Sequence, residues 1–148
     1  MSQDLLVRLI ENYDDLLDLV PLKQADDSEC VGSPISEELA LEKIMSMEED
    51  GSDFWIAKYE QMPVGYAIGI VRGESYRSEG IYVSPDYRGR EIGLALKQAQ
   101  IELARNLGCD EIFSNVTNVN EASKRVQEKA GFRFEPSGAG YIVRLSLK

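Results

Sequence analysis

The stretch YRGREIGLAL at positions 87–96 carries residue types that could hold a phosphate group. Arg88 and Arg90 supply positive charge, while Gly89 and Gly93 let the main chain approach a ligand closely. Apolar residues at helical spacing follow this turn, so we expect unpaired N–H groups of a helix start to point out of it and to favour an anion. A Gly-rich turn alone could also simply link a strand to a helix.

Proton transfer in this chain must use carboxylate, Tyr, Lys, Cys or water, because the sequence contains no histidine. That excludes Ser-His-Asp and Cys-His catalysis. Alternation along EGIYV places Glu79 on the same strand face as Ile81 and Val83, and a carboxylate among apolar neighbours is a candidate general base. The alternative is a surface ion pair with Arg72 or Arg77.

The two cysteines, Cys30 and Cys109, are far apart in the sequence, and without histidine the usual zinc ligand sets cannot be assembled. We therefore expect reduced thiols and no metal. The N-terminus has no basic segment followed by an apolar one, and no apolar run reaches the roughly 18 residues that a membrane span requires. The sequence predicts a cytoplasmic protein without membrane contact.

Negative charge is concentrated in the first third of the chain. Residues 1–53 hold 15 Asp and Glu against 3 Lys and Arg, and residues 54–148 hold 11 against 13, which gives −12 and +2. This segment could be a solvated surface or could attract a cationic partner. Nucleic acid is not expected as a partner, because its recognition calls for a basic surface.

The elements that must position these residues follow from hydrophobic periodicity. Strands are expected over 5–10, 54–59, 63–71, 78–83, 110–116, from 131 and over 141–147. Helices are expected from Asp14 to a bend or end at Pro21, from Ser36 to Gly51, over 92–107 and over 120–130, with a loop over 25–34. In the second helix, Leu41, Ile44 and Met45 are expected on one face.

The order βααβββαβαββ predicts an α+β fold, a mixed and mostly antiparallel sheet flanked by helices. Strands 78–83 and 110–116, joined by a helix, should be parallel with a right-handed crossover. The length of 148 residues predicts a single domain over 1–148.

Three motifs, together with this order, resemble the GNAT superfamily of acyl-CoA-dependent N-acyltransferases. They are V-x-P-x-Y-R-G-x-x-I-G over 83–93, N-x-x-S from Asn120 to Ser123 and K-x-G-F over 129–132. The family signature is Arg/Gln-x-x-Gly-x-Gly/Ala. Arg88 and Gly93 occupy its outer places, whereas Glu91 replaces the inner glycine.

The resemblance implies that acetyl-CoA is the acyl donor. Main-chain N–H groups from Arg88 to Leu94, here called the signature segment, would hold its pyrophosphate. The pantetheine arm would run beside the strand at Ile81 to Val83 and form main-chain hydrogen bonds, as an added strand does. The implied coenzyme residues are Ile81, Tyr82, Val83, Arg88, Gly89, Arg90, Glu91, Ile92, Gly93, Leu94, Asn120 and Ser123. Asn120 and Ser123 could instead be a plain helix cap and a helix surface residue.

Glu91 should weaken coenzyme binding without abolishing it. A side chain does not remove main-chain donors, and a carboxylate in a first helical turn interacts favourably with the helix dipole. Repulsion from phosphate, and strain if the position requires positive φ, act against binding. We predict that Glu91→Gly binds coenzyme A more tightly.

The resemblance also implies catalytic roles. Glu79 matches the position of a base that acts directly or through water, and the Val83 N–H would polarise the thioester carbonyl. Many members carry a Tyr as general acid where this chain has Gln127. We therefore assign no acid, because a thiolate of pKa about 8.5 leaves far more readily than an amine loses its proton.

The acceptor pocket of the family usually involves the first two helices, here the acidic segment. A cationic primary amine is therefore expected, with Asp26, Asp27 and Glu29 as its ligands, although these residues could belong to a mobile polar loop. The layout is loosely similar to small aminoglycoside 6′-N-acetyltransferases. A non-catalytic coenzyme A-binding domain and a simple interaction module remain alternatives to the enzyme. Because many members of the family form dimers, a homodimer is a further expectation.

Overall fold

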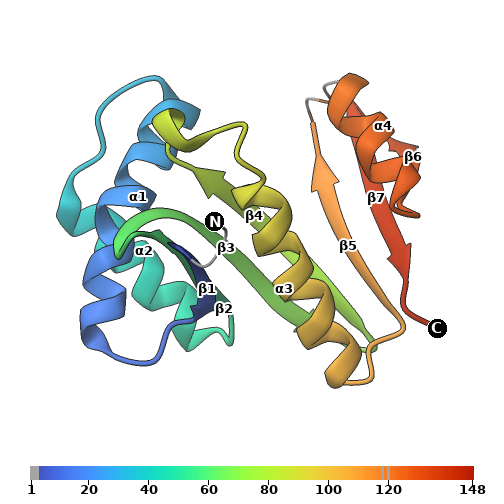
Figure 1. The fold of residues 1–148 in the computed structure, drawn as a ribbon, viewed down its shortest axis with the longest axis horizontal. Helices are drawn as coiled ribbons and strands as arrows, with labels where there is room; N and C mark the ends of the chain where they lie inside the picture. Colours follow the sequence, from blue (N-terminus) through green and yellow to red (C-terminus); the bar gives the residue numbers. More distant parts are fainter. Residues whose placement is uncertain (1–3, 118, 120) are drawn as a thin grey trace. The chain divides into compact units, whose positions relative to one another are not determined.

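The computed structural model describes residues 4–117, 119 and 121–148, and its elements follow the expected order (Figure 1). Seven strands form a mixed sheet with the order β1-β2-β3-β4-β5-β7-β6. The elements are β1 Leu5–Leu9, α1 Tyr13–Val31, α2 Glu37–Glu49, β2 Asp53–Tyr59, β3 Met62–Arg72, β4 Ser75–Val83, a 3-10 helix Pro85–Tyr87, α3 Ile92–Asn106, β5 Glu111–Val116, α4 Glu121–Lys129, β6 Arg133–Ser137 and β7 Gly140–Ser146. The predicted α+β class is confirmed.

The chain divides into two compact units. Unit 1 contains the described residues through Ile68 together with Ile81–Ala99, and unit 2 contains Gly69–Gly80 and Gln100–Lys148. The signature segment, residues 88–94, therefore belongs to unit 1, whereas Glu79 and α4 belong to unit 2. A single domain over 1–148 stays a prediction.

Helix α1 starts and continues differently from the sequence expectation. Its N-cap is Asn12, not Asp14, because the Asn12 Oδ1 accepts a hydrogen bond from the Asp15 N–H at 2.9 Å. The helix also continues through Pro21, which is exposed, where we expected a bend or an end. Its opposite face buries Leu16, Leu19, Val20 and Leu22. This burial outweighs the cost of an internal proline, about 3 kcal/mol.

The C-terminal end of α1 corrects a second expectation. The helix ends at Val31, and Gly32 follows in the left-handed region with φ 75°, donating its N–H to the Ser28 carbonyl at 2.9 Å. The predicted loop over 25–34 is therefore wrong for residues 25–31. The three candidate acceptor ligands lie in the last turns of this helix: Asp26, Asp27 and Glu29.

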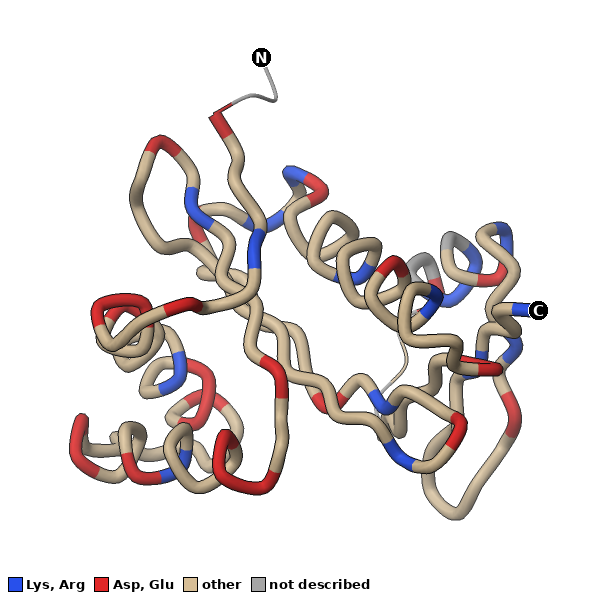
Figure 2. The backbone as a smooth tube through the Cα atoms, turned by 90° about the horizontal axis from the view of Figure 1, so that it is seen from below, with Lys and Arg blue, Asp and Glu red and all other residues tan. Residues whose placement is uncertain are grey.

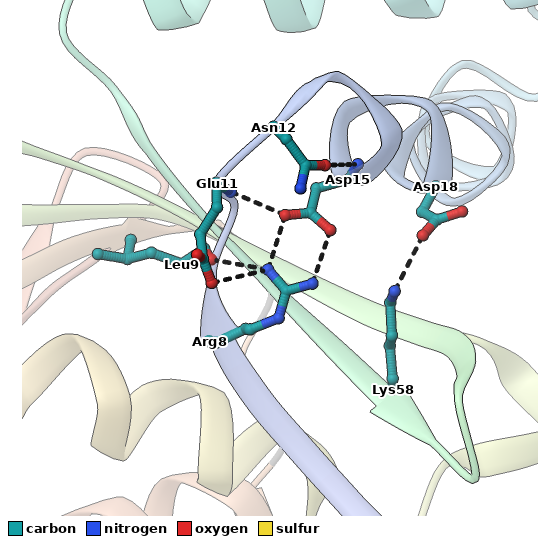
Figure 3. A network of polar contacts seen from close by, with 7 residues as sticks. All are labelled: Arg8, Leu9, Glu11, Asn12, Asp15, Asp18 and Lys58. Atoms are coloured by element: carbon teal, nitrogen blue, oxygen red, sulfur yellow. Dashed lines mark hydrogen bonds and ion pairs between the residues drawn. The ribbon is translucent and has the colours of Figure 1, made fainter.

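An ion-pair network fixes the start of α1 to β1 (Figure 3). Arg8 donates from both Nη atoms to the two carboxylate oxygens of Asp15, at 2.6 and 2.7 Å, and the Glu11 N–H adds a third hydrogen bond at 2.8 Å. The Asp15 side chain is only 4% exposed. Arg8 holds the pKa of the Asp15 carboxyl well below its usual range, with the Glu11 N–H contributing.

Helix α2 covers the same core. Ser36 caps it as predicted, with its Oγ accepting from the Leu39 N–H at 3.1 Å. Ile44 is fully buried and Leu41 packs against the core, but Met45 is 46% exposed and Met47 occupies the predicted place on this face. The sheet contributes Phe54, Ile56, Tyr66, Ile68 and Tyr82 to this cluster.

Unit 2 contains the predicted parallel pair. Residues 75–77 of β4 pair in parallel with 111–113 of β5, which confirms the expected relation of these strands. Strand β7 is antiparallel to both β5 and β6, and helix α4 contacts β6. Inside the unit, the buried Ser78 hydroxyl donates to the Gln100 Oε1 at 2.7 Å.

Candidate active site

The segment Arg88–Leu94, here called the coenzyme loop after the role that the sequence predicts for it, leads from β4 into α3. The 3-10 helix precedes it, and within it Gly89 adopts φ 82° and Glu91 adopts φ 64°. Both values lie in the left-handed region, which glycine occupies without strain and glutamate does not. The structure therefore places Glu91 at a position of positive φ, the condition under which the sequence predicted strain.

The start of α3 presents main-chain donors. The Glu91 carbonyl accepts from the Ala95 N–H at 3.0 Å, so the N–H groups of residues 92–94 precede this helical hydrogen bond. Gly93 packs beside β4, since a Cβ added there would lie 3.8 Å from Val83 Cγ2 and 3.9 Å from Ile81 Cγ2. An anion at this helix start would meet oriented N–H groups and the positive end of the helix dipole.

The Arg88 side chain contacts protein groups on β4 and α1. Its Nε donates to the Val83 carbonyl at 2.9 Å, and its Nη2 lies 3.3 and 3.4 Å from the two carboxylate oxygens of Glu29. The guanidinium also lies over the Tyr82 ring, 5.5 Å from its centroid. Arg88 therefore connects the coenzyme loop to the acidic end of α1.

The Arg90 side chain lies on an aromatic pair instead. Its guanidinium is 5.0 Å from the centroid of the Tyr87 ring and 5.7 Å from that of Tyr59, and these two rings are 5.9 Å apart. Such contacts are attractive, because the ring face carries partial negative charge. Sequence reasoning did not find this arrangement, since Tyr59 lies on β2, far from the loop along the chain.

Two buried tyrosines orient the acidic residues at the end of α1. The Tyr66 hydroxyl donates to Asp26, and the Tyr82 hydroxyl donates to the Glu29 Oε2 at 2.7 Å. The two rings are 5.9 Å apart and belong to β3 and β4. Asp26 and Glu29 therefore each accept a hydrogen bond from a tyrosine of this pair, and their role as acceptor ligands stays a prediction. Tyr66 was missed, because its pattern showed only a buried strand position.

These contacts set the protonation states of Glu29 and of the two tyrosines. The hydrogen bonds from Tyr82 and Arg88 lower the pKa of Glu29, so its carboxyl is ionised at neutral pH. Burial and the Glu29 carboxylate raise the pKa of Tyr82 to about 12, and burial and Asp26 raise the pKa of Tyr66 as well. Both tyrosines are therefore neutral donors at pH 7.

Asp27 is occupied by helix packing. Its carboxylate accepts from Lys23 at 2.9 Å and pairs with Lys43 of α2 at 3.5 Å. The side chain is only 12% exposed. This pairing joins α1 to α2, so the Asp27 carboxylate has two lysine partners, whereas Asp26 and Glu29 accept from tyrosines.

The remaining predicted residues belong to unit 2. Glu79 lies on β4 and is exposed, and its role as a general base stays a prediction. Ser123 lies on α4, but its side chain, like all of Asn120, is outside the described residues. Gln127 is half-buried on the same helix.

Within residues 4–117, 119 and 121–148, no helix is long and apolar enough to cross a bilayer. Across the same residues, no group of three or more Cys, Asp or Glu side chains could hold a metal ion.

Residues 17–132 match the acetyltransferase (GNAT) family. Aminoglycoside N(6′)-acetyltransferase type 1 of Klebsiella aerogenes is 29% identical over 109 residues, which cover 74% of this chain and 69% of the relative. The probable N-acetyltransferase camello of Xenopus tropicalis is 30% identical over 99 residues, which cover 64% and 44%. The chain thus spans less than half the length of the camello protein.

Solved structures share the fold over nearly the whole chain. The PaiA N-acetyltransferase of Thermoplasma acidophilum, solved in complex with coenzyme A, has a TM-score of 0.75 at 18% identity, covering 96% of this chain and 98% of that one. An N-acetyltransferase of Staphylococcus aureus Mu50 has a TM-score of 0.77 at 17% identity, covering 97% and 99%. With the family match extending over most of the sequence, the chain belongs to the GNAT family of acetyltransferases.

Proposed function

We propose that this protein transfers an acetyl group from acetyl-CoA to the primary amine of a cationic acceptor, by direct attack in a ternary complex. The observation that carries the proposal is the contact between Arg88 of the coenzyme loop and Glu29 on α1. This contact links the loop that we propose as the pyrophosphate site to a carboxylate that is ionised at neutral pH, and both belong to unit 1. The relative from Klebsiella aerogenes, named for an aminoglycoside acceptor, supports an amine as substrate.

The residues of the coenzyme loop suit a pyrophosphate. The main chain around Gly89 and Glu91 adopts left-handed conformations, and the N–H groups of residues 92–94 start α3. No side chain is needed for this kind of binding. When bound, acetyl-CoA supplies an activated thioester, while the Val83 N–H is proposed to polarise its carbonyl. The pantetheine arm would lie along residues 81–83.

The acceptor amine needs a negative environment and a base. The Glu29 carboxylate, ionised and oriented by Tyr82, would attract the ammonium form, and Asp26 would add to this attraction. An amine of pKa about 10.4 is neutral only about once in 2,500 molecules at pH 7. We propose that Glu79 accepts its proton through water, since the exposed side chain is accessible to solvent.

Figure 2 shows Asp and Glu positions along α1 and α2, the helices that carry most of the acidic first third. Such a field raises the local concentration of cations and weakens with ionic strength. Aminoglycosides, polyamines and peptide amines share this charge. The proposal also includes a single domain over 1–148, a cytoplasmic location and a homodimer as expectations.

The first test is thermal unfolding with and without acetyl-CoA and coenzyme A. A ligand at 100 times its Kd adds about 2.7 kcal/mol of stability, so a clear rise in Tm is expected. Thiol release is then measured with cationic and neutral amines. Binding without turnover on any amine would support a non-catalytic coenzyme A-binding domain, and no shift at millimolar coenzyme would refute the proposal.

The second test concerns Glu29. We expect Glu29→Gln to raise the KM for a cationic amine about fivefold. Glu42→Gln, a change of equal charge at an exposed position of α2, serves as the matched control. Equal effects of both variants would mean that the field of the helices, rather than Glu29 itself, attracts the acceptor.

A further inference from the structure

We propose that Arg90, lying on the rings of Tyr59 and Tyr87, is a positioning residue that holds the coenzyme loop in its left-handed conformation at Glu91. This inference rests on the proposed function, because it concerns the loop that would bind the pyrophosphate of coenzyme A. It gives Arg90 a different role from the phosphate contact that the sequence suggested.

The loop needs support at Glu91. With φ 64°, this residue lies in a region that disfavours L-amino acids with a side chain. Its carbonyl accepts the Ala95 N–H at 3.0 Å, so the same peptide that is strained also starts α3. If Glu91 relaxed to negative φ, the N–H groups of residues 92–94 would lose their orientation.

Arg90 supplies a fixed attachment beside this strained residue. Its two aromatic contacts, at 5.0 and 5.7 Å, involve the Tyr87 ring in the 3-10 helix directly before the loop and the Tyr59 ring on β2. Tyr59 is the last residue of β2 and pairs with Leu5 of β1, and the Tyr87 hydroxyl contacts the Met62 sulfur at 3.8 Å. Two such contacts correspond to about a five- to thirtyfold bias of the loop toward the observed conformation.

The two arginines act on opposite sides of a flexible point. Arg88 is tied to the Val83 carbonyl and to Glu29 before Gly89, and Gly89 itself can adopt many conformations. The contacts of Arg88 therefore do not fix the backbone beyond Gly89. Among the described contacts of the loop, those of Arg90 lie next to Glu91 and tie this part of it to the sheet.

The test compares variants in coenzyme A affinity, measured by calorimetry, and in hydrogen exchange of the Ala95 amide in the unliganded protein. We expect Arg90→Ala and Tyr59→Leu each to raise the Kd about fivefold or more and to speed exchange. Tyr59→Phe keeps the ring face and should preserve both, and Arg90→Lys should restore part of the affinity. Arg105→Ala removes an equal charge from the exposed end of α3 and should change neither.

A double-mutant cycle with Glu91→Gly separates positioning from direct contact. Glycine removes the strain, so Arg90→Ala should raise the Kd less than twofold in the Glu91→Gly background. An undiminished loss there would show that Arg90 contacts phosphate and would overturn the proposal. So would unchanged exchange of the Ala95 amide in Arg90→Ala.

Failure of the proposed function has a different signature. If the wild-type protein bound no coenzyme A, the acetyltransferase proposal would be refuted. Hydrogen exchange in the unliganded protein would still decide whether Arg90 holds the loop.

Discussion

The ion pair between Arg8 and Asp15 gives a quantitative prediction for stability. Replacing Asp15, whose side chain is only 4% exposed, by Asn removes the bidentate carboxylate partner of Arg8 and leaves the Arg8 guanidinium with the exposed Glu11 carboxylate at 3.5 Å. Two hydrogen bonds from Arg8 and one from the Glu11 N–H meet this carboxylate. An Asn can still accept through its single Oδ1, but its amide group would face the Arg8 donors.

Removing one partner of a fully buried ion pair costs about 3–5 kcal/mol. Because the Arg8 side chain is 28% exposed and Asn keeps one acceptor, we expect Asp15→Asn to lower the free energy of unfolding by about 2–3 kcal/mol. The matched control is Asp18→Asn on the same helix. Asp18 pairs with Lys58 at 3.0 Å but is 39% exposed, so its loss should cost less than about 1 kcal/mol. Urea unfolding at pH 7 measures both free energies of unfolding. Equal losses would refute the assignment of this difference to burial.

The same pair predicts a pH dependence. Because the folded pKa of Asp15 is lowered, its stabilisation is fully present above the unfolded pKa of about 3.9 and is lost as pH falls from there through the folded value. Below about pH 4, the wild-type protein should therefore lose stability more steeply than Asp15→Asn. Parallel curves for the two proteins between pH 5 and 2 would contradict this reasoning.

Three further substitutions have defined outcomes. Glu79→Gln should lower kcat about 100-fold while coenzyme A affinity changes less than twofold; an unchanged kcat would remove Glu79 as the base. Gly65→Ala places a Cβ 2.7 Å from the Tyr82 carbonyl oxygen and should lower the free energy of unfolding by about 1–3 kcal/mol. Gly80→Ala, where the added Cβ meets no atom within 4 Å, should leave that free energy unchanged in the same urea unfolding experiment. Pro21→Ala should raise the Tm, because alanine restores the main-chain N–H donor that proline lacks inside α1. A lower Tm would show that Pro21 favours the native helix.

Local chemistry made several features predictable. Ser36 caps α2 as its type suggests, and Gly108 adopts positive φ just after α3, where the sequence predicted the end of that helix. The coenzyme loop was recognisable because its glycines, its arginines and the following helical period are contiguous. Contiguous patterns of this kind depend on short-range interactions, which a sequence displays directly.

Pro21 and Met45 show where local patterns failed. The proline penalty is local, but burial of the apolar face of α1 is a tertiary effect that exceeds it. The sequence pattern predicts Met45 on the same helix face as Ile44. In the structure, α2 lies on the core so that Met47 packs inward in its place. Neither outcome follows from spacing alone.

The α+β order of elements, the Gly-Arg turn before α3 and the acidic character of the first helices follow from patterns within short stretches of the sequence. Packing of the elements on one another brings Asp27 to two lysines and Glu29 to Tyr82 and Arg88. It also decided that Arg90 lies on an aromatic pair. The reason is physical: hydrophobic periodicity and turn chemistry act over a few residues, whereas partners of a charged side chain come from elements that packing brings together.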